Sequence, residues 1–157
     1  MRVGIGYDSH RLVSGRPLIL GGEHIPSDRG LEGHSDADAA AHALTDAILG
    51  AAGIGNIGEL FPDTDPAWKD ADSLALLRMA HDRVIRQGYR AVQADLTIIL
   101  EHPKLGPAVP AIRRGLAEAV GLPVEAICVK PKTNEGMGFI GRGEGIAVLA
   151  VATLEPC

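Results

Sequence analysis

Apolar segments recur along the chain, and short polar or glycine-rich stretches separate them. Several of these segments have the β-branched or alternating apolar pattern of strands in a sheet. The predicted strands are Arg2 to Tyr7, Arg90 to Leu100, Val124 to Val129 and Gly145 to Leu154. A further apolar segment, Leu18 to Ile25, contains Gly21-Gly22 at its centre, which predicts a hairpin with a tight glycine turn.

Three other segments have the apolar spacing of helices. They run from about Asp36 to Ala51, from about Asp72 to Gln87 and from about Pro107 to Val120. Ser35 or Asp36 is the expected N-cap of the first helix, and a glycine follows each helix, where helices commonly stop. Asp28 to His34, Asn56 to Trp68 and Lys130 to Arg142 are rich in glycine, proline or polar residues and are expected to be loops or irregular segments.

This mixture of strands and helices predicts an α+β fold. We expect a two-layer sandwich over residues 1–157, with a mixed four-stranded sheet, helices on one face and a small hairpin. The opposite face of the sheet also needs a cover, and association of identical subunits is the simplest one in a chain of this length.

Composition narrows the class of protein. The net charge is −5 and no block of Lys or Arg occurs, so nucleic acid is not an expected partner. The longest apolar stretch, Ile146 to Leu154, is far shorter than the roughly 20 residues that span a membrane. No signal peptide is visible, and Cys128 and Cys157 form no disulfide framework; Cys128 is expected to be a buried thiol. We therefore expect a cytoplasmic protein in a reducing compartment.

Asp8, His10 and His42 are candidate metal ligands. Asp8 and His10 are two residues apart at the end of the first predicted strand, so both side chains can point to the same side. His42 lies on the first predicted helix and can approach from a second direction. Three protein ligands with one open position are typical of catalytic zinc. The alternative is that these are ordinary polar residues of a loop and a helix, because a D-x-H motif alone is common.

Two carboxylates on the same helix face are candidates to hold His42 in place. Asp38 and Asp46 are each four residues from His42, and a metal-binding histidine usually bonds an acceptor through its second nitrogen. Alternatively, Asp38 stabilises the N-terminus of the helix and Asp46 is solvated. His34-Ser35 precede the helix, where free backbone N–H groups suit a phosphate, although Ser35 could be a plain N-cap.

An ordered set of motifs carries a family resemblance. The motifs are D-x-H, HSDADAAAH, LFPDTDP, PKTNEG and GFIGRGEG. Together they resemble the 2-C-methyl-D-erythritol 2,4-cyclodiphosphate synthase family, and the resemblance runs from about Arg2 to about Ala150. It implies a phosphorus–oxygen lyase that acts on a cytidine diphosphate compound and releases CMP in the non-mevalonate isoprenoid pathway.

The resemblance also implies site residues. His34 and Thr133 are the implied catalytic residues, and Zn²⁺ is implied on Asp8, His10 and His42, with Mg²⁺ or Mn²⁺ near Glu135. The implied substrate contacts in the first half are Asp8, Ser9, His10, His34, Ser35, Asn56, Ile57, Gly58, Phe61, Pro62, Asp63, Thr64 and Asp65. Those in the second half are Leu100, Pro103, Lys104, Leu105, Gly106, Lys132, Thr133, Asn134, Glu135, Phe139 and Arg142. The chain departs from the family pattern at Asn56, usually Asp, and at Pro131 and Lys132.

The implied assembly is a homotrimer around a central channel, with each active site between neighbouring subunits. Two alternatives remain open from the sequence. One is a zinc hydrolase that activates water, with Asp38 or Asp46 as base. The other is a nucleotide-binding or isoprenoid-sensing trimer with structural zinc.

Overall fold

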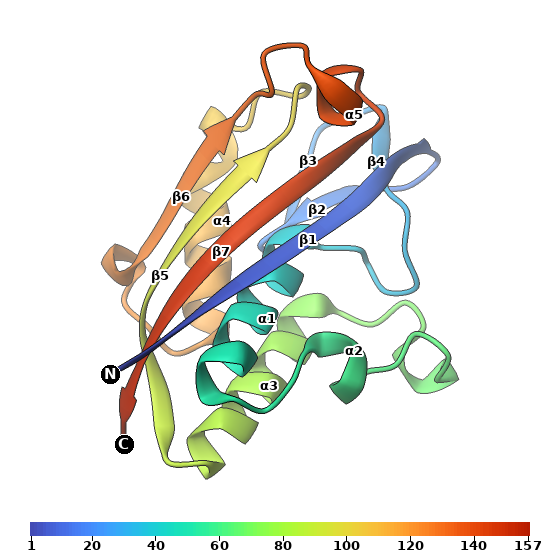
Figure 1. The fold of residues 1–157 in the computed structure, drawn as a ribbon. Helices are drawn as coiled ribbons and strands as arrows, with labels where there is room; N and C mark the ends of the chain where they lie inside the picture. Colours follow the sequence, from blue (N-terminus) through green and yellow to red (C-terminus); the bar gives the residue numbers. More distant parts are fainter.

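Three long strands form the middle of the sheet in the computed structural model, which describes residues 1–157. The strands are β1 (Arg2–Ser14), β4 (Arg29–Leu31), β5 (Tyr89–Ile99), β6 (Ile127–Lys132) and β7 (Gly145–Pro156). They form one five-stranded sheet in the order β4-β1-β7-β5-β6 (Figure 1). Only β5 and β6 pair in parallel, so the sheet is mixed. The predicted hairpin is confirmed as β2 (Leu18–Leu20) and β3 (Glu23–Ile25), which form a separate two-stranded sheet.

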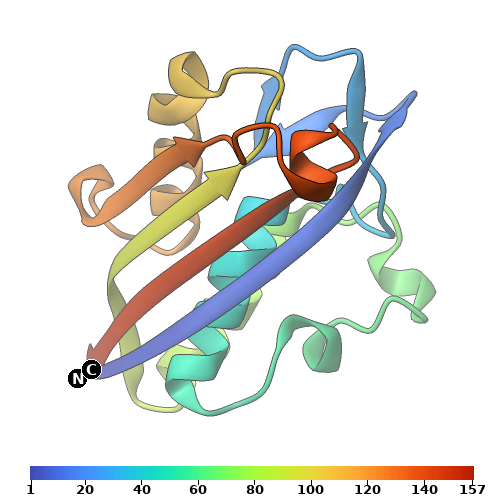
Figure 2. The same cartoon turned by 45° about the horizontal axis from the view of Figure 1, so that its top comes forward.

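The larger helices cover one face of the five-stranded sheet, which confirms the expected two-layer arrangement (Figures 1 and 2). The helices are α1 (Ala39–Ala52), α2 (Ile57–Leu60), α3 (Ser73–Arg86), α4 (Val109–Ala119) and α5 (Gly138–Gly141). Short 3₁₀ turns occur at Pro66–Trp68, Gly106–Ala108 and Val124–Ala126. Gly53 ends α1 in the left-handed conformation, as predicted. The N-cap of α1 is Asp38, however, and not Ser35 or Asp36.

Two glycines of β1 allow α1 to lie directly on the sheet. A Cβ atom at Gly4 would overlap the carbonyl oxygen of Ala47, and one at Gly6 would overlap that of Ala43. The facing residues of α1 are mostly alanines, so the helix backbone and the strand backbone come close together. Since Asp8 and His10 continue the same side of β1 and His42 precedes Ala43, this contact places the candidate metal ligands.

The structure corrects several predicted boundaries. The sheet has five strands and not four, because Arg29–Leu31, expected in a loop, pairs with the end of β1. β1 continues past Tyr7 to Ser14, since its polar residues keep pairing with β7 and β4. β6 starts at Ile127, after a 3₁₀ turn, and extends to Lys132. Pro131 is tolerated there because β6 is an edge strand. Cys128 is exposed and not buried, because residues of β6 alternate between the two faces of the sheet.

The face of the sheet opposite the large helices exposes apolar side chains on its central strands. These are Val3, Ile5 and Tyr7 on β1 and Leu149 and Val151 on β7. Ile5 pairs with Val151 and Tyr7 with Leu149, so the side chains form one continuous patch.

None of the helices has the length and apolar character needed to cross a membrane. The cytoplasmic location stays a prediction.

Candidate active site

The three expected metal ligands converge between β1 and α1. Asp8 Oδ2 lies 2.7 Å from His10 Nδ1 and 3.6 Å from His42 Nδ1. The candidate ligand atoms of the three residues all lie within 4.8 Å of one another. The spacing of two along β1 points Asp8 and His10 toward the helix layer, and His42 meets them from the first turn of α1. This cluster could hold a metal ion.

The polar atoms of this cluster fit a bound cation. Asp8 Oδ2 and His10 Nδ1 are buried and lie 2.7 Å apart, but neither forms a hydrogen bond with good geometry. Burial opposes the charged form of Asp8, but the side chains of His10 and His42 beside it lower the pKa of Asp8 below its ordinary value. Burial likewise opposes the charged form of His42, and Asp8 raises the pKa of His42 above its ordinary value. A cation held by these atoms would satisfy the carboxylate and replace a proton.

The partners of His42 differ from the two that were expected. Its Nε2 atom lies 2.8 Å from Ser73 Oγ and 3.2 Å from Ser35 Oγ. Asp46 instead accepts a hydrogen bond from the backbone N–H of Ile57 at 2.7 Å, which ties α1 to the start of α2. The prediction that Asp46 or Asp38 orients His42 is therefore wrong in this structure.

Asp38 has a separate structural role. Its carboxylate is fully buried and accepts hydrogen bonds from the backbone N–H groups of Gly21, Gly22 and Ala41. Burial raises the pKa of Asp38 to about 6 although these three N–H groups oppose the shift. Asp38 thus caps α1 and fixes the β2–β3 hairpin against it. Because this carboxylate occupies the start of α1, His34-Ser35 do not stand at an open helix N-terminus, and Ser35 Oγ accepts from the N–H of Ala37.

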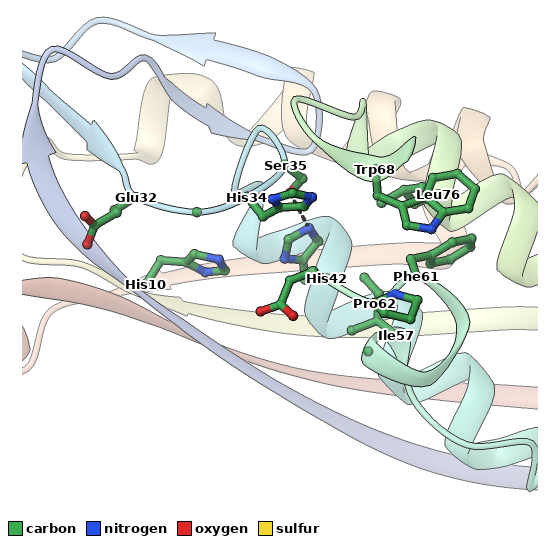
Figure 3. A pocket seen from close by; sticks show the side chains of 13 residues that line it. His10, Glu32, His34, Ser35, His42, Ile57, Phe61, Pro62, Trp68 and Leu76 are labelled. Carbon is green, nitrogen blue, oxygen red and sulfur yellow. Dashed lines mark hydrogen bonds between the residues drawn. The ribbon is translucent and has the colours of Figure 1, made fainter. Parts of the chain in front are cut away.

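A cavity of about 460 Å³ opens beside the Asp8–His10–His42 cluster (Figure 3). Its lining residues are His10, Glu32, Gly33, His34, Ser35, His42, Ile57, Gly58, Phe61, Pro62, Asp63, Trp68 and Leu76. Figure 3 shows His10 and His42 at one side and Phe61, Trp68 and Leu76 at the other, so one side can bind charge and the other an apolar group. Phe61 and Trp68 meet edge to face, with ring centroids 5.0 Å apart.

Four of these lining residues had no place in the sequence interpretation. Glu32 and Gly33 belong to the segment that was considered only a loop, and Trp68 closes an irregular segment. Leu76 is one of the buried residues of α3. Five contacts expected in the first half of the chain do not line this cavity. Asp8 and Ser9 lie on β1, Asn56 caps α2, Asp65 caps the turn at Pro66–Trp68, and Thr64 lies between these last two segments.

The expected nucleotide-binding residues gather elsewhere. Leu100, Lys104, Leu105, Gly106, Lys132 and Thr133 line a cavity of about 140 Å³ together with Pro131. It lies at the ends of β5 and β6, which β7 separates from β1. Glu101, which the sequence interpretation omitted, accepts a hydrogen bond from the N–H of Asn134 at 2.6 Å and so joins the two loops. Pro103, Asn134 and Glu135 belong to these loops without lining the cavity, and Glu135 is exposed.

The remaining expected residues border a third cavity. Ser9, His10 and Phe139 line it with Arg11, Glu144 and Gly145, and its volume is about 230 Å³. Arg142 is paired with Glu144 through a 2.7 Å contact. His34 and Thr133, the two expected catalytic residues, therefore stand at different cavities of one chain. A single chain brings the metal-binding residues together but does not join them to the expected nucleotide-binding residues.

Comparisons with known proteins find relatives that match nearly the whole chain. The model of the YgbB family matches residues 1–155. The 2-C-methyl-D-erythritol 2,4-cyclodiphosphate synthase of Symbiobacterium thermophilum is 57% identical over 154 residues, 98% of each chain. The enzyme of that name from Salinibacter ruber is 56% identical over 155 residues, 99% of each chain. A solved 2C-methyl-D-erythritol-2,4-cyclodiphosphate synthase, a bound form with CDP, has a TM-score of 0.90 and 46% identity over 98% of this chain and 100% of that chain. These matches confirm the resemblance expected from the motifs, and the chain belongs to the YgbB family.

Proposed function

We propose that this chain converts 4-diphosphocytidyl-2-C-methyl-D-erythritol 2-phosphate to 2-C-methyl-D-erythritol 2,4-cyclodiphosphate and releases CMP. It would thus act as a phosphorus–oxygen lyase of the non-mevalonate isoprenoid pathway. The support is the high identity to synthases of that name along nearly the whole chain. The observation that carries the proposal within the structure is the Asp8–His10–His42 cluster beside a cavity of about 460 Å³, in which the buried atoms Asp8 Oδ2 and His10 Nδ1 form no hydrogen bond with good geometry.

The donor set favours zinc. One carboxylate and two imidazoles with an open fourth position are typical of catalytic zinc sites. When bound, such an ion supplies a Lewis acid that polarises a phosphoryl oxygen. Glu135 offers a single exposed carboxylate in the loop of Thr133, which suits Mg²⁺ or Mn²⁺ held jointly with substrate phosphates.

The reaction needs no nucleophile from the protein. An oxygen of the 2-phosphate forms a bond to the β-phosphorus, and the bond from that phosphorus to the bridging oxygen breaks, so CMP leaves with the electron pair. The chain's own residues position the phosphates and offset their charge. His34 and Ser35 lie at the cavity beside the metal ligands, where an imidazole and a hydroxyl can donate to phosphate oxygens. Thr133 would donate its hydroxyl to a phosphate from the nucleotide-binding side.

We further propose that the protein acts as a homotrimer. The apolar patch of Val3, Ile5, Tyr7, Leu149 and Val151 lies on the face of the sheet that the large helices leave uncovered. Three copies that pack these faces together would bury the patch around a central channel. Subunit contact would also bring the cavity of Thr133 in one chain next to the metal cluster of its neighbour. That arrangement accounts for the separation of the two cavities within a chain.

The test is a product assay with the proposed substrate. Purified protein should release CMP and form the cyclic diphosphate, which phosphorus NMR distinguishes from linear phosphates. A strong chelator should stop the reaction, and added zinc should restore it. A linear bisphosphate as the product would indicate instead a hydrolase that activates water. No turnover with this substrate, despite full zinc loading and added Mg²⁺, would contradict the proposal.

A further inference from the structure

A row of buried and half-buried polar side chains extends from the candidate metal ligand His42 to the start of α3. His42 Nε2 lies 2.8 Å from Ser73 Oγ, and the Ser73 hydroxyl donates a short hydrogen bond to Asp36 Oδ1. Ser73 is fully buried, and it is the first residue of α3. The three residues come from three separate segments, and neither Ser73 nor Asp36 lines the cavity.

Asp36 is held in place by the backbone on both sides. Its Oδ2 atom accepts the backbone N–H of Ser73 at 3.1 Å, and its Oδ1 atom also accepts the N–H of Asp38 at 3.1 Å. Its own N–H donates to the carbonyl oxygen of Ala71 at 3.1 Å. The carboxylate therefore bridges the segment before α1 and the start of α3, and it cannot rotate away from Ser73 without losing these bonds.

These contacts fix which atom carries each proton. A carboxylate only accepts hydrogen bonds, so the single proton of the Ser73 hydroxyl points to Asp36. Ser73 Oγ then faces His42 with a lone pair, and a hydrogen bond between them requires the proton on His42 Nε2. The neutral imidazole has one N–H, so Nδ1 keeps its lone pair, and Nδ1 is the atom 3.6 Å from Asp8 Oδ2.

We infer that Ser73 and Asp36 are positioning residues that fix the tautomer and ring orientation of His42, so that Nδ1 is presented to the metal. This inference rests on the proposed metal site and adds two residues to it. Ser35 Oγ, at 3.2 Å from the same Nε2, is a weaker second acceptor, because it already accepts the N–H of Ala37. The role expected for Asp46 or Asp38 therefore belongs to Asp36, acting through Ser73.

Zinc affinity of the purified protein, measured by competition with a coloured chelator, tests the inference without any assay of turnover. Ser73→Ala removes the acceptor for Nε2–H and should weaken zinc binding roughly 10–100-fold. Asp36→Asn should have an effect of the same size. Its amide can donate a hydrogen bond to Ser73 Oγ, so that the Ser73 hydroxyl proton points to His42 Nε2 and favours the other tautomer. The two residues act in series, so the double variant should lose little more than the worse single variant.

Two matched controls separate positioning from general damage. Asp72→Asn changes the neighbouring charge at the start of α3 but keeps an N-cap for Leu74. Thr45→Ala removes a buried hydroxyl of α1 that donates to the Ala41 carbonyl and does not contact His42. Both should bind zinc as the wild type does. If Ser73→Ala folds poorly, Asp36→Asn alone tests the inference, and its circular dichroism spectrum checks that it is folded.

Nitrogen NMR of the metal-free, histidine-labelled protein gives a direct readout of the tautomer. At a pH where His42 is neutral, the proton should reside on Nε2 in the wild type, and this preference should weaken in both variants. A proton on Nδ1 in the wild type, or wild-type zinc affinity in both folded variants, would overturn the inference. A wild-type protein that binds no zinc would instead contradict the proposed metal site itself.

Discussion

The candidate metal-binding region and the expected nucleotide-binding region of this chain, called the metal-binding and nucleotide-binding regions below, are built in different ways. In the first, ligands from β1 and α1 meet where two backbones pack closely, and buried partners such as Ser73 hold them. In the second, Leu100 to Gly106 and Lys132 to Glu135 form loops at the ends of β5 and the edge strand β6, around a cavity of only about 140 Å³. The core thus positions the candidate metal ligands within one chain, whereas the expected nucleotide-binding loops lie at the edge of the sheet.

The sharpest way to break the metal-binding region is His42→Ala. We expect zinc content and CMP release to fall to background, because two protein ligands remain at a site that needs three. The fold should persist, since alanine is favourable inside a helix. Elemental analysis and circular dichroism check both parts, with exposed His24→Ala as the control. Full zinc retention by His42→Ala would remove this residue from the ligand set.

The dependence of the nucleotide-binding region on a neighbour can be tested by mixing two inactive variants. His42→Ala damages one region and Thr133→Ala the other, so each should be nearly inactive alone. If the regions of neighbouring chains combine, co-refolding equal amounts should restore roughly a quarter of wild-type activity, because about half times half of the sites are intact in a mixed ring. Mixed trimers, confirmed by mass, that remain inactive would place each site within one chain.

Gly6→Ala should loosen the metal-binding region through the core. Its Cβ would overlap the carbonyl oxygen of Ala43, so α1 must move away from β1 and take His42 with it. We expect a loss of roughly 1–3 kcal/mol or more in the free energy of unfolding, together with weaker zinc binding. Gly50→Ala is the matched control on the same helix. The nearest atom to its Cβ is 3.9 Å away, and it should stabilise the protein by roughly 0.5–1 kcal/mol.

Glu135→Gln should affect only the nucleotide-binding region. If this carboxylate helps to hold a phosphate-bridging cation, the Mg²⁺ or Mn²⁺ concentration that gives half-maximal activity should rise several-fold. Zinc content should remain unchanged, since Glu135 is exposed and does not belong to the Asp8–His10–His42 cluster. Titration of activity against Mg²⁺ measures the effect, and an unchanged midpoint would show that Glu135 does not contact the cation.

The smallest predicted effect lies outside both regions, at His81. Its Nε2 atom accepts the N–H of Ala91 at 3.2 Å, and burial lowers the pKa of His81 below its ordinary value. The unfolded chain therefore gains a proton at a higher pH than the folded protein, so stability from this group is lost as pH falls through about 6.5. His81→Gln should flatten that part of the pH profile of unfolding, while His24→Gln should not. An unchanged slope in His81→Gln would contradict this linkage.

The sequence predicted the metal-binding region better than its surroundings. The spacing of Asp8 and His10 and the helical position of His42 follow from local periodicity, so their convergence could be anticipated. The contact of Ser73 with His42 could not, because 31 residues separate them and only the packing of α3 against α1 joins them. A serine before an apolar stripe is an ordinary feature of a helix start.

The wrong predictions for Arg29–Leu31 and Cys128 also arise because contacts between distant segments decide the outcome. Arg29–Leu31 has no strand pattern of its own, and it pairs because the end of β1 offers free backbone groups. Cys128 was expected inside because its neighbours are apolar, but Ile127 and Val129 occupy the buried face of β6 and leave Cys128 on the other. Local composition identifies strands, whereas the fold decides which face of each strand is buried.

The backbone contact of Gly4 and Gly6 with α1 has a consequence for measurement. Since the strand has no side chain at these two positions, the spacing of the two layers is transmitted to Asp8, His10 and His42 without a flexible intermediary. If Co²⁺ binds to these ligands, its visible absorption spectrum should therefore depend on the spacing between β1 and α1. Truncation of Leu44 or Ile48, both fully buried on α1, should change the absorption spectrum although neither residue is a candidate ligand. The visible absorption of bound Co²⁺ would then report changes in the packing of α1 against β1.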